Sequence, residues 1–457
     1  MPPLRVSLNK LLQLNMTDLQ YHYSGVSTFT KTKGINRLVL AHQTEIEAVN
    51  NIPCFFWGSL TDPYVTAKCW STIAKVVRSS FGPIPASLRD PIVTAGTERI
   101  RFEGFSSCNG VYVRLDMKPA SIDGEFMASG TTNVDFNDPM LNALNSIQKN
   151  EKVTLAVGQQ EVQVITSKTK VTEKKVTLPT RWIKGLTSVQ LYLADMDLKF
   201  ELNKIQTIQL FQNLPKGTVK GDFFISKRAG KFMFSTLATA DAVRVGGLHR
   251  LRLLDGILAI ADKVYIYESA DKQTIAFVYE FGKMQLLMAF SPDAYRGFSG
   301  EGKALDQMTE NLPVEWVYGL NSLLKANENF DPTLLSIEHD IDFGTMGQLT
   351  SSLSSIGLLG YDLMGRSHFY RQLPFKTERI LSLNPRLKNA KKLIDEEQVQ
   401  ILKKENSYIE AEVKGTGVLH KVVIDKQGYR CTCEWFTTYQ GKRGICKHIL
   451  AVKMLAG

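Results

Sequence analysis

The stretch CTCEWFTTYQGKRGICKH, residues 431–448, places three cysteines and one histidine in an order that is typical of metal sites. Its spacing is C-x-C, twelve further residues, and then C-x-H. Residues two apart on a strand project to the same face, so Cys431 and Cys433 can present two thiolates to one ion. We expect Cys446 on the turn before a helix and His448 in its first turn, where the N-terminal helix dipole favours a thiolate.

Three thiolates and one imidazole favour four-coordinate Zn²⁺ in a closed structural site. Lys442, Arg443 and Lys447 can balance the net negative charge of such a site. A unit this small is not stabilised by apolar burial alone, so metal binding should contribute much of its folding free energy. The alternative is two buried thiols, a surface cysteine and a solvated histidine. We favour the metal site because three of the six cysteines fall in metal order together with a histidine.

This pattern resembles the SWIM zinc finger, a β-β-α unit with C-x-C, a variable loop and C-x-H. Trp435 and the Gly444-Ile445 approach also fit the family. The resemblance implies one structural Zn²⁺ with the ligands Cys431, Cys433, Cys446 and His448. We expect the finger to occupy the core, 420–457, of a C-terminal unit at 381–457 that binds a protein or a nucleic acid.

Three further segments resemble bacterial SWIM zinc finger family proteins. They are RDPIV at 89–93, FSSCNGVY at 105–112 and LNPRL at 383–387. Genes for such proteins often stand beside those for MoxR-type ATPases and von Willebrand A-domain proteins. The resemblance therefore implies an accessory role in such a system, with these proteins as partners.

The composition is that of a globular chain. With 457 residues, 44% of them apolar, it is too long for one core, and we expect three or four folding units. Its net charge of +10 favours an anionic partner. Cys54, Cys69 and Cys108 match no metal spacing and are expected to be reduced, buried thiols. No signal-peptide core or membrane span is visible, so we expect a cytoplasmic protein that does not bind a membrane.

We predict a multi-domain α+β fold. Residues 1–120 are expected to form a mixed α/β domain, and residues 121–300 a β-rich domain that resembles a sliding-clamp-like module. The elements expected in the first domain are a helix at 66–81 and a hairpin of strands 98–105 and 110–117, turning at Asn109-Gly110. Those expected in the second are strands at 152–157, 161–165, 170–178, 191–202, 221–234 and within 262–290, and helices at 139–149 and 241–254.

Residues 301–380 have the outline of a winged helix, with helices at 314–329, 332–339 and 343–357 and a hairpin at 358–375. The third helix of such a domain can enter the major groove of DNA, but here it carries no arginine or lysine, so base reading would be weak. Before the cysteine cluster we expect a basic helix that begins within residues 383–387. Two strands, near 408–413 and 420–425, are expected to follow it.

Basic residues on the hairpin, on the following helix and beside the metal ligands are the candidates for partner contact. They are Arg366, Arg371, Lys376, Arg379, Lys388, Lys391, Lys392, Lys442, Arg443 and Lys447. A protein partner and DNA both remain open, and a steep loss of binding with salt would indicate DNA. A second basic cluster, at 168–184, is equally well explained as a solvated strand face.

No acid–base or nucleophile constellation is visible, and we predict that the protein is not an enzyme. An enzyme with a site in the β-rich region is the less favoured alternative. The nearest phosphate-binding pattern is GFSGEGK at 297–303, but Ala304 lacks the hydroxyl that holds Mg²⁺ and Glu301 would repel phosphate. We expect a loop there.

Two further histidines are candidates, His420 as a substitute metal ligand and His339, with Asp340 and Asp342, as part of an acid–base or metal cluster. His420 is interpreted as a strand-edge residue and not as a substitute ligand, because four ligands already close the site. His339 with Asp340 and Asp342 is interpreted as a solvated helix end, because no further histidine or cysteine lies at ligand spacing.

Overall fold

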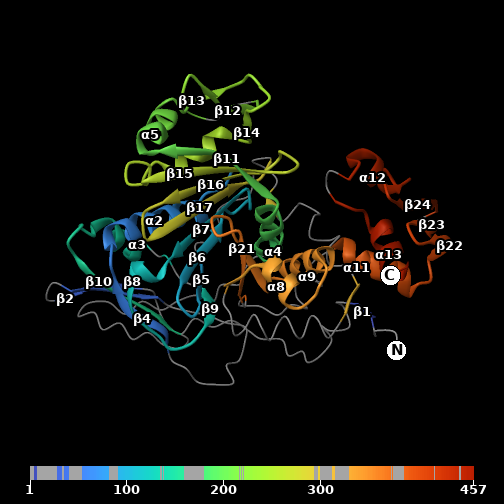
Figure 1. Ribbon diagram of the computed structural model, residues 1–457, viewed down its shortest axis with the longest axis horizontal. Helices are drawn as coiled ribbons and strands as arrows, with labels where there is room; N and C mark the ends of the chain where they lie inside the picture. Colours follow the sequence, from blue (N-terminus) through green and yellow to red (C-terminus); the bar gives the residue numbers. More distant parts are fainter. Residues whose placement is uncertain are drawn as a thin grey trace.

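The structure of the protein is a computed structural model that describes most of the chain in separate stretches. The described residues are 5–7, 28–32, 35–40, 54–81, 91–133, 136, 138–158, 180–215, 217, 219, 221–292, 297–298, 311–313, 329–371, 373, 385–415, 417–441 and 444–456. They form helices and several sheets, which confirms the α+β class. A main body and a smaller C-terminal unit at one end of the molecule are distinct in Figure 1. None of the described helices is long and apolar enough to cross a membrane.

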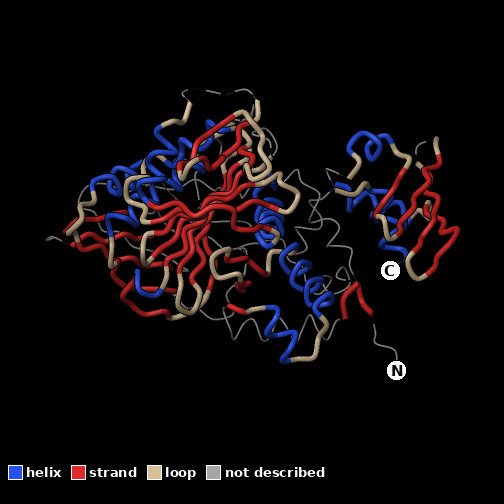
Figure 2. The backbone as a smooth tube through the Cα atoms, turned by 45° about the horizontal axis from the view of Figure 1, so that its top comes forward, coloured by secondary structure: helices blue, strands red, loops and turns tan. Residues whose placement is uncertain are grey.

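An eight-stranded antiparallel sheet forms the centre of the main body (Figure 2). Its strands, in spatial order, are β11 (Met196–Asn203), β15 (Lys263–Ser269), β16 (Ile275–Glu280), β17 (Met284–Phe290), β7 (Val111–Met117), β6 (Ile100–Phe105), β5 (Ile92–Ala95) and β9 (Gly130–Asn133). The predicted turn is confirmed, because β6 and β7 pair on either side of Asn109, whose φ is 58°. The predicted first helix is α2 (Pro63–Val77). It covers one face of the sheet, where Trp70 packs on Phe102 with ring centroids 5.1 Å apart.

Strands from both sides of residue 120 pair with each other, so the boundary expected there does not separate two sheets. β7 pairs with β17 along its whole length. A five-stranded sheet also crosses this position, with the order β2 (Thr28–Thr32), β3 (Ile35–Leu40), β10 (Lys152–Gly158), β4 (Cys54–Leu60) and β8 (Ile122–Phe126). The 3-10 helix η1 (Pro119–Ser121) leads into β8, and the predicted helix at 139–149 is confirmed as α3 (Asp138–Ser146). The short strands β1 (Arg5–Ser7) and β18 (Asn311–Pro313) pair separately.

Two elements differ from the sequence-based prediction. The first part of the strand expected at 191–202 is the end of helix α4 (Thr180–Ala194), because Trp182, Leu186 and Leu193 are fully buried at helical spacing. The helix expected at 241–254 is instead strand β14 (Val243–Val245) followed by the 3-10 helix η2 (Leu248–Leu254). β14 joins β12 (Phe223–Arg228) and β13 (Lys231–Ser235) in a small sheet beside α5 (Lys204–Gln212). The strands expected at 161–165 and 170–178 lie outside the described residues.

Two of the three helices and the hairpin of the expected winged helix are present. They are α8 (Pro332–Glu338), α9 (Phe343–Ser355), β20 (Leu359–Asp362) and β21 (Ser367–Tyr370), and β19 (Asn329–Phe330) pairs with β21. The helix expected at 314–329 lies outside the described residues apart from Asn329. The second half of α9 is buried, with Ser352, Ser354 and Ser355 at most 2% exposed. These serines cannot reach a DNA base, which agrees with the expectation that base reading by this helix is weak.

Charged side chains join the segment 329–371 to the second face of the central sheet. On that face Arg101, Arg114 and Asp116 are at most 1% exposed, and the Asp116 carboxylate accepts from both arginines at 2.9 and 2.8 Å. The guanidinium of Arg101 lies 3.7 Å from the ring centroid of Phe369 in β21. Burial alone would raise the pKa of Asp116, but the two guanidinium groups lower it. Strands β6 and β7 are therefore buried on both faces although they alternate apolar and charged residues.

The C-terminal unit is a four-stranded antiparallel sheet covered on one face by a helix. Its elements are α11 (Pro385–Asp395), β22 (Val399–Glu405), β23 (Tyr408–Lys414), β24 (Leu419–Asp425), β25 (Gly428–Cys431), α12 (Glu434–Tyr439) and α13 (Lys447–Ala456). α13 packs on the sheet and α11 packs on α13. The basic helix and the two expected strands are confirmed as α11, β23 and β24, whereas β22 was not predicted. Ala411, Val422 and Leu450 are fully buried between the sheet and α13.

Candidate metal centre

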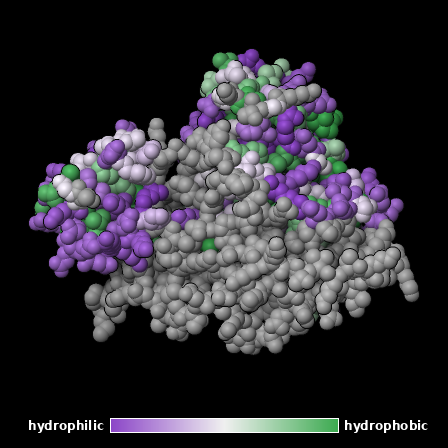
Figure 3. Space-filling view, turned by 180° about the vertical axis from the view of Figure 1, so that it is seen from behind, coloured by the Kyte–Doolittle hydropathy of each residue, from purple (hydrophilic) through white to green (hydrophobic). Residues whose placement is uncertain are grey.

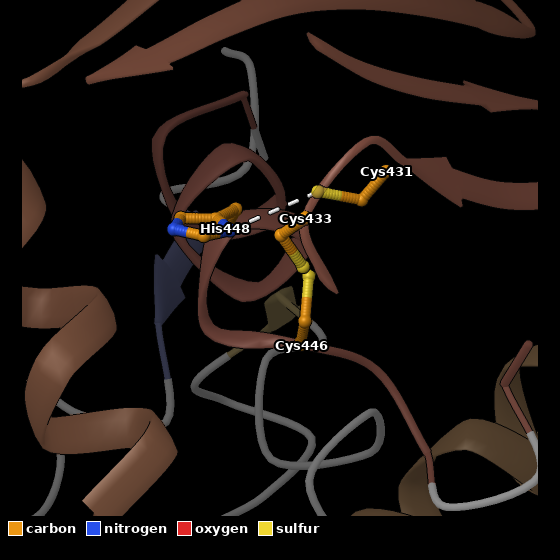
Figure 4. A group of neighbouring side chains, drawn as sticks. All are labelled: Cys431, Cys433, Cys446 and His448. Atoms are coloured by element: carbon orange, nitrogen blue, oxygen red, sulfur yellow. Dashed lines mark hydrogen bonds between the residues drawn. The ribbon is translucent and has the colours of Figure 1, made fainter. Parts of the chain in front are cut away.

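The three cysteines and the histidine of the 431–448 stretch converge in the C-terminal unit (Figure 4). Cys431 ends β25, Cys433 precedes α12, Cys446 precedes α13 and His448 lies in the first turn of α13. Their ligand atoms all lie within 4.8 Å of one another, and all four side chains are buried. This is the only such group of histidine, cysteine and acidic residues among the described residues.

The second half of the motif has the predicted local structure, but the first half does not. Cys446 and His448 lie as predicted, but Cys433 is not on the strand, because β25 ends at Cys431 and Cys433 is the N-cap of α12. After α12 the chain turns back through Gln440, Gly441 and Gly444, whose φ angles are 46°, 79° and 75°. Glycine adopts this left-handed region without steric cost. The turn delivers Cys446 to the thiols of the first half.

Hydrogen bonds favour a thiolate at Cys446. The hydrogen bond from the Cys431 thiol lowers the pKa of Cys446 to about 4, against the opposing effect of burial. The backbone N–H of Ile449 also points at the Cys446 sulfur, at 3.5 Å, as expected at the start of a helix. The pKa of Cys431 is raised, first because it donates that bond to Cys446, and burial raises the pKa of Cys433. A bound metal would hold all three sulfurs as thiolates.

The donor set fits tetrahedral zinc. Zn–S bonds of about 2.3 Å and Zn–N bonds of about 2.0 Å put ligand atoms about 3.5–3.8 Å apart in a tetrahedron. The Nδ1 atom of His448 lies 3.7 Å from the sulfur of Cys431, and the whole group lies within 4.8 Å. Small side-chain movements therefore complete the coordination of one structural Zn²⁺ by Cys431, Cys433, Cys446 and His448. A catalytic zinc keeps one coordination position open for water or substrate, and these four ligands leave no such position.

Two residues outside the motif contact the residues of the centre. His420 in β24 is not among the clustered ligands, but its ring stacks on His448 with centroids 4.3 Å apart, so it is more than a strand-edge residue. Arg386 in α11 donates to the carbonyl of Ile445 at 2.9 Å and lies 4.8 Å from the ring centroid of Trp435. No local sequence signal indicates either contact, because both join residues that are distant in the chain.

The predicted partner-contact residues fall into three groups. Exposed or half-buried residues are Arg366 at the β20–β21 turn, Lys388, Lys391 and Lys392 on α11, and Lys447 on α13. Residues outside the described part of the chain are Lys376, Arg379, Lys442 and Arg443. Arg371 forms the third group, because it is 1% exposed and its guanidinium donates to both carboxylate oxygens of Glu103, at 2.8 and 2.7 Å. The prediction that Arg371 contacts a partner is therefore wrong.

The other candidates have structural roles. Asp342 caps α9, accepting from the backbone N–H of Thr345 at 2.9 Å, which fits the helix-end interpretation. Phe298 of the glycine-rich run is fully buried, and its backbone N–H donates to the carbonyl of Asn109 at 2.9 Å. The beginning of that run is therefore packed into the core and cannot cradle a phosphate. Cys69 is fully buried in α2, and burial raises the pKa of its thiol, so it is an inert core residue.

The centre belongs to the class of structural zinc fingers. Residues 420–457 match the family model of the SWIM zinc finger, so the chain contains a SWIM finger with these four ligands. No curated protein matches the chain.

Among solved structures, the chain is similar to Proliferating Cellular Nuclear Antigen from Entamoeba histolytica, at 11% identity and a TM-score of 0.33. It is also similar to the PCNA2–PCNA3 complex from Sulfolobus tokodaii, at 8% identity and a TM-score of 0.34. Each similarity covers 52% of this chain and 99% of the other. Scores of this size do not establish a common fold.

Proposed function

We propose that this protein is a non-catalytic binding protein whose zinc-held C-terminal unit contacts the phosphate backbone of a nucleic acid. The observation that carries the proposal is the distribution of charge in this unit. Residues 385–457 contain fourteen basic and eight acidic side chains, so they carry +6 of the net charge of +10. A closed ligand set leaves the zinc no substrate position, which favours binding over catalysis.

The acidic side chains are used mainly on the outer face of the sheet. Lys403 pairs with Glu405 at 3.0 Å, and Lys421 pairs with Glu410 at 2.5 Å. Arg430 pairs with Asp425 in the same way. The first pair lies within β22 and the other two join neighbouring strands, and together they neutralise charge on the face that points away from α13. The excess of positive charge of the unit therefore lies in side chains outside these three pairs.

The helix side of the unit carries cations at the zinc end. The Arg386–Ile445 hydrogen bond places the start of α11 beside the segment that leads into Cys446. Lys388 and Lys391 on α11 and Lys447 on α13 are in no ion pair among the described residues. Figure 3 shows a largely hydrophilic surface over this unit. Such an array suits phosphate groups, which bind through charge without reading sequence.

A salt titration of DNA binding tests the proposal. The affinity of the full-length protein for fluorescent duplex DNA is measured at several salt concentrations. The double variant Lys388→Ala/Lys391→Ala should bind more weakly, and the slope of log affinity against log salt concentration should fall in magnitude by about 2. Lys403→Ala with Lys421→Ala, on the neutralised face, is the matched control. Equal affinity and salt slope for the two double variants would contradict the proposal.

A protein partner is the second candidate function, and one observation favours it. Val418, directly before β24, and Leu419, the first residue of β24, are 59% and 60% exposed beside the zinc end. Salt-insensitive capture of a protein that is lost in Val418→Asp would favour this candidate. An accessory role with MoxR-type ATPase and von Willebrand A-domain proteins, and a cytoplasmic location, remain predictions from the sequence.

A further inference from the structure

We infer that His420 is a positioning residue for the zinc ligand His448, acting through ring stacking. The role of His420 concerns only the zinc centre and does not depend on which partner the protein binds. Histidines that bind metals usually donate their second ring N–H to a carboxylate, a carbonyl or a water, and this bond fixes the orientation of the ring. In the C-terminal unit the ring of His448 is held differently.

The hydrogen bond that usually orients a ligand histidine is missing among the described residues. Nδ1 of His448 faces the sulfur cluster, 3.7 Å from Cys431. Its other nitrogen, Nε2, is buried and has no hydrogen-bond partner in the described part of the chain. The side chain itself is 4% exposed. The orientation of the ring must therefore come from packing.

His420 supplies that packing. Its ring centroid lies 4.3 Å from that of His448, and the two ring planes are inclined by 31°. Rings packed this closely are in van der Waals contact, and this contact excludes water from the face between them. The ring of His420 thus limits rotation of His448 while leaving its metal-facing nitrogen free.

The sheet fixes the position of His420. It lies in β24, on the same face as Val422, which is paired with Cys431 at the end of β25. The strand that carries His420 is thus hydrogen-bonded to the strand that carries the first ligand. Gly415 lies against the edge of the His420 ring, because a Cβ at this glycine would lie 2.8 Å from Nε2 of His420. The ring of His420 is therefore packed against both Gly415 and His448.

Zinc affinity of full-length variants tests the inference. In competition with a chromophoric chelator, His420→Ala should bind zinc about 10-fold more weakly, at the lower end of the effect of outer-shell partners. His420→Phe keeps a ring but no ring nitrogen, and it should stay within about 3-fold of the wild type. Leu419→Ala, on the opposite face of the same strand, is the matched control and should leave the affinity unchanged.

The Co²⁺-loaded protein gives a second readout. The visible bands of tetrahedral Co²⁺ depend on ligand geometry, so His420→Ala should shift them while the sulfur-to-cobalt absorption persists, and His420→Phe should restore them. If His420→Ala does not fold, His420→Leu, which fills the space without a ring, replaces it. The inference would be overturned if the variant without a ring bound zinc as tightly as the wild type. It would also be overturned if His420→Phe lost as much zinc affinity as that variant. None of these readouts involves DNA, so a failed binding proposal would leave the result unchanged.

Discussion

Replacing Arg371 with alanine should destabilise the main body strongly, because this arginine is the buried partner of Glu103. Its guanidinium donates to both Glu103 oxygens, at 2.8 and 2.7 Å, and to the carbonyl of Leu186 at 2.5 Å. The Glu103 carboxylate is 1% exposed, and without Arg371 it would keep the hydroxyl of Tyr112, at 2.7 Å, as its hydrogen-bond donor among the described residues. Removing one member of a buried pair costs about 3–5 kcal/mol, because the other charge is left uncompensated.

The assay is urea and thermal unfolding of the full chain, followed by the fluorescence of the buried Trp70 and Trp182. A loss of 3–5 kcal/mol corresponds to a fall in melting temperature of about 4–6 °C for a cooperative unit of about 370 residues. Arg366→Ala, at the exposed hairpin turn, is the control and should change stability by less than about 0.5 kcal/mol.

A double variant separates the effect of charge from that of packing. Arg371→Met combined with Glu103→Gln removes both charges, so it should be more stable than Arg371→Ala alone. Equal stability of Arg371→Ala and Arg366→Ala would refute the reasoning that the Arg371–Glu103 pair is buried and joins the segment 329–371 to the sheet.

Further predictions concern acid stability and the metal. Burial lowers the pKa of His368 to about 4, whereas in the unfolded chain this pKa is about 6.5. The unfolded chain therefore takes up a proton first as the pH falls, so stability is complete above about pH 6.5 and is lost progressively toward about pH 4. Up to about 3 kcal/mol should disappear over this interval in the wild type but not in His368→Phe; parallel pH profiles in urea unfolding would contradict this. Cys433→Ser should abolish zinc binding and expose residues 420–456 to limited proteolysis while the main body stays folded. Loss of structure throughout the chain would show instead that the C-terminal unit does not fold as a separate unit.

The zinc ligands could be predicted because their information is local. The order of Cys431, Cys433, Cys446 and His448 along the chain is sufficient to indicate a metal site, and the helix start after Cys446 follows from ligand spacing. The position of Cys433 could not be predicted in the same way. The C-x-C spacing is the same whether both cysteines lie within a strand or the second one lies just beyond its end. Only the pairing of β25 with β24, which stops at Cys431, decides between these two positions.

The long-range organisation could not be predicted from local patterns. The segment 98–105 alternates charged and apolar residues as a half-exposed strand does, yet the segment 329–371 buries its charged face. In the same way, the alternation within 191–202 indicates a strand, but burial of Trp182, Leu186 and Leu193 on one helical face determines that α4 continues to Ala194. Pairing of β7 with β17 and stacking of His420 on His448 depend on tertiary contacts that no short window contains.

The metal content of the purified full chain tests the central claim most directly. Elemental analysis and native mass spectrometry should give one zinc ion per chain for the wild type and none for Cys446→Ser. A wild-type chain that contains no zinc, and whose C-terminal unit resists proteolysis equally well with and without a chelator, would contradict the account.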